Sequence, residues 1–227
     1  MMPRIGVIGA GNWGKNHVKT FHALGALAAV AEADPQRREA IKEGFPQAVV
    51  YDDYRALLND ERIDGVVVAS PAFTHHEISH AALLAGKDVL VEKPMAMNLA
   101  EADELIALAK SGGRILMVGH LLLYSPAVRA IIDTVKNGDI GEIVHLELRR
   151  LKLGRVRREE NVFWSFAPHD LAVVLQLVEG APVAVKASGI CALQSNIEDD
   201  VHAHLTFENG VRAHLHASWF WPEVERR

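Results

Sequence analysis

The sequence predicts an α/β protein with two parts: an N-terminal, doubly wound domain on a parallel sheet and a C-terminal α+β domain on an open, mostly antiparallel sheet. From residue 4 to about 119, short apolar runs alternate with amphipathic stretches, which is the pattern of βαβ units. After Gly119 the pattern changes to longer runs in which apolar and charged residues alternate. We therefore place a domain boundary near residue 120, between parts that span 1–120 and 121–227.

The elements of the first part follow from these runs. Apolar, β-branched segments predict strands at 4–8, 27–33, 65–69, 88–91 and 114–118. The helices expected between them lie at 14–24, 35–43, 54–58, 74–85 and 99–110, and several end at a glycine, as at Ala85-Gly86. Asn98 is the expected N-cap of the last helix, with Glu101 as its capping-box partner.

The second part is expected to contain helices at 126–136 and 168–178 and strands at 142–151, 182–193, 199–207 and 211–220. In the last two strands the apolar residues occupy odd positions, so one buried face requires a loop at 208–210 with Gly210 in the left-handed region. The opposite face then carries histidines and can hold a metal ion. A polar face in solvent or at a subunit contact needs no special geometry, so we predict no metal. The histidines are His202, His204, His214 and His216.

Composition excludes several classes of protein. The chain has 227 residues, of which 49% are hydrophobic and 23% charged, as in ordinary globular domains. A formal net charge of −5 offers no basic surface for nucleic acid. No apolar run approaches the roughly 18 to 20 residues of a membrane span, and the N-terminus lacks a signal-peptide pattern. The single Cys191 cannot form an internal disulfide, so a cytoplasmic location without a membrane partner is expected.

The segment Gly9-Ala10-Gly11-Asn12-Trp13-Gly14 predicts a dinucleotide site, because it follows a strand and opens a helix. The first glycine permits a tight turn, the second lets the backbone approach a pyrophosphate, and the third permits close helix packing. The helix N-terminus supplies N–H donors for the phosphates. Its expected cofactor-binding residues are Gly9, Gly11, Asn12, Trp13 and Gly14.

Asp34 ends the next strand, 20 residues after Gly14. A carboxylate at this place accepts hydrogen bonds from the ribose hydroxyls and repels a 2′-phosphate, so we predict NAD in preference to NADP. Arg37 and Arg38 argue in the other direction, because they could accommodate that phosphate. The alternative is that both are solvent-exposed residues at the start of a helix.

Two more segments follow strand ends at the carboxyl edge, where open α/β folds bind ligands. Ser70-Pro71 with His75 follows the third strand, and Glu92-Lys93-Pro94 follows the fourth. Lysine before proline is held extended, and its ammonium could stabilise an alkoxide; a surface lysine in a turn is the alternative. The first segment is expected along the cofactor, although a capping turn explains it equally well.

Residues 154–170 gather cations, aromatic rings and a His-Asp pair. His169 is a natural base for a sugar hydroxyl, and Arg155 and Arg157 could hold a diphosphate while Trp164 stacks on a ring. The alternatives are a solvated basic loop and a histidine that only caps a helix. The expected substrate-binding residues are Arg155, Arg157, Asn161, Trp164, Ser165 and His169.

These motifs resemble the Gfo/Idh/MocA oxidoreductase family. The resemblance implies an N-terminal Rossmann domain and a C-terminal domain whose sheet often makes oligomer contacts. It also implies hydride transfer between a nicotinamide cofactor and a sugar or polyol, with Lys93 and His169 near the reacting carbon. The motifs are Gly9 to Gly14, Asp34, Ser70-Pro71 with His75, the stretch 82–87, Glu92-Lys93-Pro94 and Ile140-Gly141.

Within the family, the stretches 119–126, 153–161, 164–170 and 218–222 resemble the branch that oxidises C3 of UDP-N-acetylhexosamines or their uronates. A nucleotide-sugar substrate, NAD and a homo-oligomer are then expected. Two alternative functions stay open. One is a dehydrogenase of the same family that acts on a free sugar or inositol, and the other is a non-enzymatic, NAD-responsive binding module. Many members carry Asp where Ser165 stands, so a carboxylate partner of His169 would have to be Asp170. Members usually run longer, so an incomplete second sheet is expected.

Overall fold

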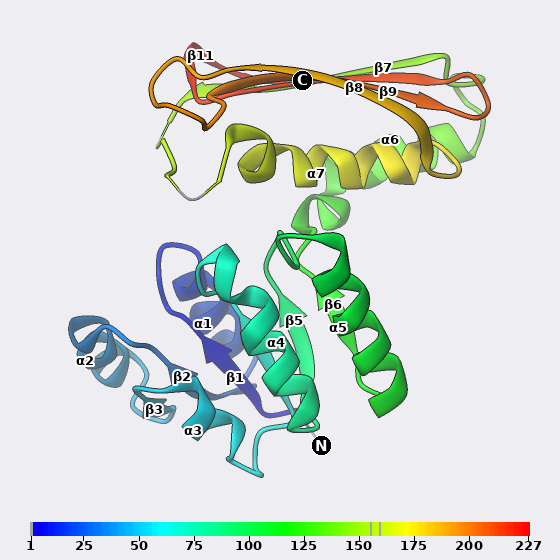
Figure 1. Cartoon of the computed structure of the whole chain (residues 1–227). Coiled ribbons are helices and arrows are strands. Elements are labelled where there is room, and N and C mark those ends of the chain that lie inside the picture. The colour runs from blue at the N-terminus through cyan, green and yellow to red at the C-terminus, as the bar shows by residue number, and fades with distance from the viewer. Residues whose placement is uncertain (1, 155, 159) are drawn as a thin grey trace. The chain divides into compact units, whose positions relative to one another are not determined.

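The computed structural model describes residues 2–154, 156–158 and 160–227, and the chain divides into two compact units, Met1–Gly119 and His120–Arg227. Each unit combines one sheet with helices (Figure 1). The predicted α/β class, with a parallel first sheet and a mostly antiparallel second one, is confirmed.

The first unit is a six-stranded parallel sheet in the order β3-β2-β1-β4-β5-β6. This order is that of a doubly wound nucleotide-binding domain, with β1 and β4 at the centre where the direction of winding reverses. Its strands are β1 (Ile5–Ile8), β2 (Leu27–Ala31), β3 (Val49–Tyr51), β4 (Gly65–Val68), β5 (Asp88–Val91) and β6 (Leu116–Val118).

Helices cover both faces of this sheet, as the alternation of side chains requires. Val7, Val30 and Val67 pack with α1 and α2, whereas their chain neighbours such as Ile8 and Val68 pack with α4 and α5. The helices are α1 (Gly14–Ala23), α2 (Pro35–Gly44), α3 (Tyr54–Leu58), α4 (His75–Leu84) and α5 (Leu99–Gly112), with a 3-10 turn η1 (Ala72–Thr74) before α4.

The second unit has a five-stranded sheet in the order β11-β7-β10-β9-β8, in which β7 and β10 are parallel and the other neighbours antiparallel. Helix α7 packs against one face of this sheet through Ala167 and Val174. The elements are η2 (Leu121–Tyr124), α6 (Pro126–Lys136), β7 (His145–Leu153), α7 (Val162–Leu177), β8 (Pro182–Ile190), β9 (Asp200–Phe207), β10 (Arg212–Ser218) and β11 (Phe220–Arg226).

The predicted register of β9 and β10 is confirmed. Ala203 pairs with Leu215 and Leu205 with Ala213, all buried on the α7 side, and Gly210 has a φ of 85° in the connecting loop. The even positions therefore share the other face, where the four histidines pair across the two strands.

Sequence reasoning misplaced the start of one helix and did not predict two strands. Helix α7 begins at Val162 rather than at residue 168, because Asn161 caps it and Pro168 is accommodated inside the helix. Strand β3 was missed because three residues are too short for a periodicity argument. Strand β11 was missed because Pro222 and the charged residues around it conceal an edge strand, which is where proline is tolerated.

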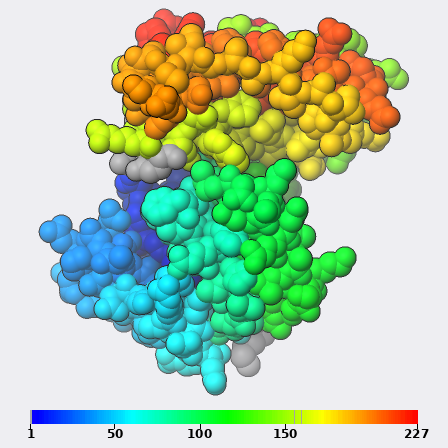
Figure 2. Space-filling model, viewed as in Figure 1, coloured from blue at the N-terminus to red at the C-terminus, as the bar shows by residue number. Residues whose placement is uncertain are grey.

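The edge strand β8 is exposed along almost its whole length. Val183, Val185 and Ile190 have exposed fractions of 64%, 59% and 59%. Figure 2 shows this gold-to-orange part of the chain at the surface. Among the described residues, none of the helices combines the length and the apolar character that a bilayer crossing needs.

Candidate functional site

The glycine-rich loop joins β1 to α1, and its three glycines have different environments. A Cβ on Gly9 would lie 2.9 Å from Ser70 N, and its φ of 88° favours glycine. A Cβ on Gly14 would lie only 1.9 Å from the carbonyl oxygen of Gly9. A Cβ on Gly11 would meet Arg37 Nη1 at an ordinary 3.6 Å. The fold thus needs Gly9 and Gly14, whereas Gly11 leaves the uncrowded backbone that a pyrophosphate requires.

Glu32, directly after β2, holds this loop through a buried carboxylate. The residue is 7% exposed; its Oε2 accepts a hydrogen bond from Ala10 N at 2.6 Å and its Oε1 accepts one from Asp34 N at 3.0 Å. Arg37 Nη1 lies 3.7 Å from Oε1 and offsets the charge. Sequence reasoning missed Glu32 because the motif directed attention to Asp34. The signal that could have identified Glu32 was its position as an acidic residue directly after the predicted strand core.

Asp34 is the N-cap of α2. Its Oδ1 accepts hydrogen bonds from Gln36 N at 2.9 Å and Arg37 N at 3.1 Å. The backbone N–H of Arg37 is the main cause that lowers the pKa of the Asp34 carboxyl, against a smaller opposing effect of burial. The side chain is 42% exposed at the carboxyl edge of the sheet. A second role toward a ribose stays a prediction.

Glu92 ties the end of β5 to the first helix. Its Oε1 accepts hydrogen bonds from Trp13 Nε1 and His17 Nε2, each at 2.7 Å. Burial acts to raise the pKa of Glu92, but the hydrogen bonds from His17 and Trp13 outweigh it and hold the pKa below its ordinary value. Lys93, half-buried, is the next residue and so follows a fixed strand end. Sequence reasoning missed His17, the fourth residue of α1, because the glycine motif does not specify which residue stands there.

His75 links the two loops that follow β4 and β5. Its imidazole is 2% exposed, with Nδ1 at 2.6 Å from Pro94 O and Nε2 at 2.9 Å from Ser70 O. Ser70 Oγ and Thr74 Oγ1 are 2.7 Å apart, and Thr74 donates to Pro71 O. The predicted segment is therefore a hydrogen-bonded turn that fixes both loops, and no side chain of this turn caps α4.

In the second unit, Asn161 has a structural role. Its Oδ1 caps α7 by accepting from Trp164 N at 3.0 Å, and its Nδ2 donates to Glu198 Oε2 at 2.8 Å. Trp164 is 39% exposed on the first turn of α7, while Ser165 is 5% exposed. Of these predicted substrate contacts, Trp164 is the one that offers a large free surface.

His169 lies two turns inside α7 and not at its start, which corrects the expectation from the sequence. The residue is half-buried. Both oxygens of the neighbouring Asp170 accept hydrogen bonds from the guanidinium of Arg150 on β7, one of them at 2.9 Å. Asp170 is thus committed to a bidentate ion pair, the strong geometry for such a contact.

Arg157 is 47% exposed at its side chain and lies 3.5 Å from Glu160 Oε1. This contact agrees with a partly neutralised basic loop and leaves the guanidinium accessible. Arg155, the other predicted diphosphate contact, lies outside the described residues.

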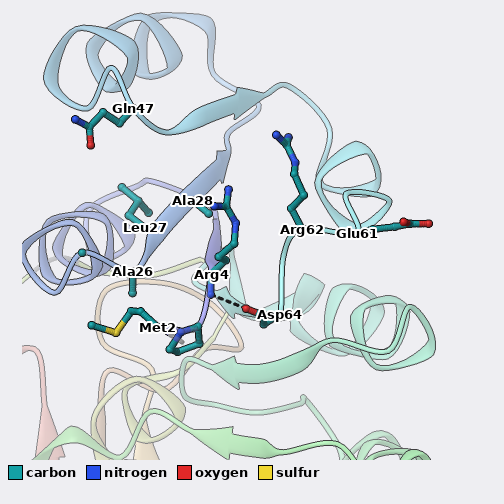
Figure 3. Close-up of a pocket in the computed structure, with 11 residues that line it drawn as sticks. Met2, Arg4, Ala26, Leu27, Ala28, Gln47, Glu61, Arg62 and Asp64 are labelled. Atoms are coloured by element: carbon teal, nitrogen blue, oxygen red, sulfur yellow. Dashed lines mark hydrogen bonds between the residues drawn. The ribbon is translucent and has the colours of Figure 1, made fainter.

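A hollow of about 800 Å³ lies at the amino edge of the first sheet, opposite the glycine loop (Figure 3). It is lined by residues just before or at the starts of β1, β2, β3 and β4, and Arg4 N donates to Asp64 Oδ2 at 2.7 Å within it. Open α/β sheets bind ligands at the carboxyl edge, so the loop edge, and not this hollow, is the candidate site.

A parallel sheet in this order, with a glycine-rich first turn and acids after the second strand, defines a dinucleotide-binding protein of the Rossmann type. Residues 3–120 match the model of the oxidoreductase family with an NAD-binding Rossmann fold, and residues 128–227 match the Gfo/Idh/MocA C-terminal domain. The chain therefore belongs to the Gfo/Idh/MocA family of oxidoreductases.

Its curated relatives act on different substrates. The UDP-N-acetylglucosamine 3-dehydrogenase of Acidithiobacillus ferrooxidans is 31% identical over 99% of this chain and 69% of its own length. The inositol 2-dehydrogenase 1 of Saccharopolyspora erythraea is 34% identical over 82% of this chain, which spans 57% of that relative. A solved structure of the Acidithiobacillus enzyme matches with a TM-score of 0.90 and 30% identity, covering 100% of this chain and 73% of that one.

Proposed function

We propose that this chain belongs to a cytoplasmic, NAD-dependent dehydrogenase that oxidises the C3 hydroxyl of a UDP-N-acetylhexosamine or its uronate. The observation that carries the proposal is the anchoring of Glu92 to Trp13 and His17. These bonds fix the strand end that bears Lys93 to the helix that opens at the glycine loop. An ammonium on a strand end that is tied to the first turn of α1 is suited to a reacting oxygen.

NAD supplies the hydride acceptor when bound. Lys93 donates a hydrogen bond to the reacting sugar oxygen and stabilises the negative charge that grows there. His169 accepts the proton of that hydroxyl through a neutral imidazole nitrogen. Arg150 holds the neighbouring Asp170, so that carboxylate serves to fix α7 to β7 and not to take the proton.

NAD is proposed in preference to NADP because of the charges after β2. Asp34 places an exposed carboxylate there, which would repel a 2′-phosphate, and Glu32 adds a second, buried negative charge. Arg38 Nη1 donates to the carbonyl oxygens of Glu32 and Ala33 at 2.8 and 2.7 Å, so this guanidinium is committed to the backbone. Arg37, which is 54% exposed, is the remaining cation and already faces both acids.

The nucleotide-sugar substrate is supported by the match over nearly the whole chain to the Acidithiobacillus enzyme and by the exposed Trp164 and Arg157. The second candidate is a free polyol, favoured by the inositol dehydrogenase matched at slightly higher identity over a shorter part of this chain. The exposed edge strand β8 supports a homo-oligomer formed through the second sheet, which size-exclusion chromatography with light scattering would detect.

The test is calorimetric titration of the chain with NAD, then of the NAD-bound form with UDP, UDP-N-acetylglucosamine and myo-inositol, followed by mass spectrometry for a product two hydrogens lighter. Binding of UDP and of the UDP sugar, with a lighter sugar, supports the proposal. Binding of inositol without UDP affinity favours the polyol. NAD binding with neither ligand would favour a binding module.

Lys93→Ala tests the assigned chemistry. Loss of this cation should lower turnover by about a hundredfold or more and leave the NAD dissociation constant within about twofold. Lys110→Ala, which removes an exposed lysine from the last turn of α5, is the matched control and should change neither. An equal loss of turnover and NAD affinity in Lys93→Ala would contradict the assignment.

A further inference from the structure

We propose that Asp200, His202 and His216 form a binding site for one divalent transition-metal ion, such as Zn²⁺, on the histidine face of the second sheet. This departs from the metal-free face expected from the sequence, where the four histidines alone were considered. The structure adds Asp200, which lies at the start of β9 on the same face, two residues before His202. His216 on β10 pairs directly with His202.

The donor atoms are already gathered. His216 Nε2 lies 3.0 Å from Asp200 Oδ2, and His202 Nε2 lies 3.5 Å from Asp200 Oδ1. Two ligand atoms bonded to Zn²⁺ at tetrahedral angles are about 3.4 Å apart, since each bond is about 2.1 Å long. Among the described residues, this group alone brings three such donors within 4.8 Å of one another. Little movement is therefore needed to coordinate an ion.

The surroundings favour a bound ion over an incidental cluster. Asp200 and His216 are 6% and 8% exposed, so a carboxylate and an imidazole are both buried on a sheet face. A buried carboxylate is costly unless a cation or hydrogen bonds compensate it, and His216 Nε2 lies 3.1 and 3.0 Å from the two oxygens of Asp200, where an ion would add a positive charge. The rings of His202 and His216 stack with centroids 3.8 Å apart, which presents both imidazoles to the same carboxylate.

His214, which pairs with His204 on the neighbouring strand, can orient the ring of His202. His202 Nδ1 lies 3.2 Å from His214 Nε2, so His202 can donate its Nδ1–H there and keep the Nε2 lone pair for a metal. Metal-bound histidines commonly use the second ring nitrogen in this way.

The charge of Arg149 lies near the proposed metal site. Arg149 on β7 is paired in register with His216 and would repel a metal ion if its charge were free. Its Nε donates to Glu147 Oε1 at 2.7 Å and its Nη1 lies 3.6 Å from Glu225 Oε1, so two carboxylates offset it. The bound ion would connect β9 to β10 and takes no part in the hydride transfer proposed above.

The experiment is calorimetric titration of the EDTA-treated, dialysed full chain with ZnCl₂, without NAD or substrate. We expect one saturable Zn²⁺ per chain, and Co²⁺ in its place should give the visible absorption of a low-symmetry, four-coordinate ion. His202→Gln changes a half-exposed side chain and should weaken binding at least about tenfold, and Asp200→Asn should do the same. Zn²⁺ should also raise the melting temperature of the wild type and not of His202→Gln.

The control is His80→Gln, which removes a histidine from a separate histidine–carboxylate group, where His80 Nε2 lies 3.3 Å from Glu104 Oε1. It should leave Zn²⁺ affinity unchanged. Non-saturable binding, binding that His202→Gln and Asp200→Asn leave intact, or an equal loss in His80→Gln would each overturn the proposal. Circular dichroism of each variant verifies folding, and none of these results depends on whether the chain is a dehydrogenase.

Discussion

Replacing Gly11 by alanine should separate cofactor binding from folding more cleanly than any other change in the glycine loop. The new methyl group would meet Arg37 Nη1 at 3.6 Å, an ordinary van der Waals distance, and Gly11 does not have the positive φ that excludes alanine. We therefore expect the folded state to accept Gly11→Ala without strain. A loop Gly→Ala change of this kind can even raise stability by about 0.4 to 1 kcal/mol, because it restricts the unfolded chain.

The expected loss of NAD affinity follows from the same geometry. The methyl group would stand where the pyrophosphate approaches the backbone, and each lost hydrogen bond to a charged group costs about 1.5 to 3 kcal/mol. At about 1.4 kcal/mol for each factor of ten, loss of one bond raises the dissociation constant roughly ten- to hundredfold. Gly14→Ala should behave differently, because its Cβ would lie 1.9 Å from a backbone oxygen and the loop would have to move.

The assay is calorimetric NAD titration together with urea unfolding of each variant. Gly11→Ala should lose NAD affinity and keep wild-type stability. Gly14→Ala should lose NAD affinity as well, and its free energy of unfolding should fall by about 1 to 3 kcal/mol. Gly44→Ala is the control: Gly44 is exposed at the end of α2, and an added Cβ meets no described atom within 4 Å. If folded Gly11→Ala bound NAD within about twofold of the wild type, the pyrophosphate would not lie on this loop.

Three further substitutions test the roles of single side chains. Glu92→Gln should lower stability at pH 7 by roughly 1 kcal/mol. Because folding lowers the pKa of Glu92 from about 4.5, this difference should fade as the pH falls below that value, which urea unfolding at several pH values would show. Asp34→Asn keeps an N-cap and removes a charge, so NADP binding should strengthen relative to NAD while stability stays constant, as paired titrations would reveal. Asn161→Ala removes the α7 cap and the donor to Glu198, and should lower the free energy of unfolding by about 1 to 2 kcal/mol in urea.

Periodicity predicted most of the fold because each long element carries its own signal. The strand Asp88–Val91 and the helix Pro126–Lys136 have the expected bounds, and the odd positions of β9 and β10 gave the register of that pair. The start of a helix is harder to predict where two residues nearby could each mark it. Proline at a helix start is common, and Pro168 therefore concealed the true cap at Asn161, seven residues before the predicted start.

The residues that hold the candidate site together could not be predicted in the same way. His17 contacts Glu92 across 75 residues of sequence, and Asp200 joins two histidines only once the sheet register is set. No local pattern marks either contact, because each depends on which side chains the fold places within hydrogen-bonding distance. Sequence reasoning located the glycine loop and the strand ends but not these partners.

The two acids after β2 show why a motif residue and its neighbour need separate tests. Glu32 is the buried one, and its short hydrogen bond to Ala10 N fixes the loop before any cofactor is present. Asp34 begins α2 and keeps its second oxygen near the surface. A loss of NAD affinity on removal of Glu32 would therefore report a displaced loop, whereas the same loss in Asp34→Asn, whose helix cap is kept, would report a missing contact to the ribose. Only the second outcome bears on the choice between NAD and NADP.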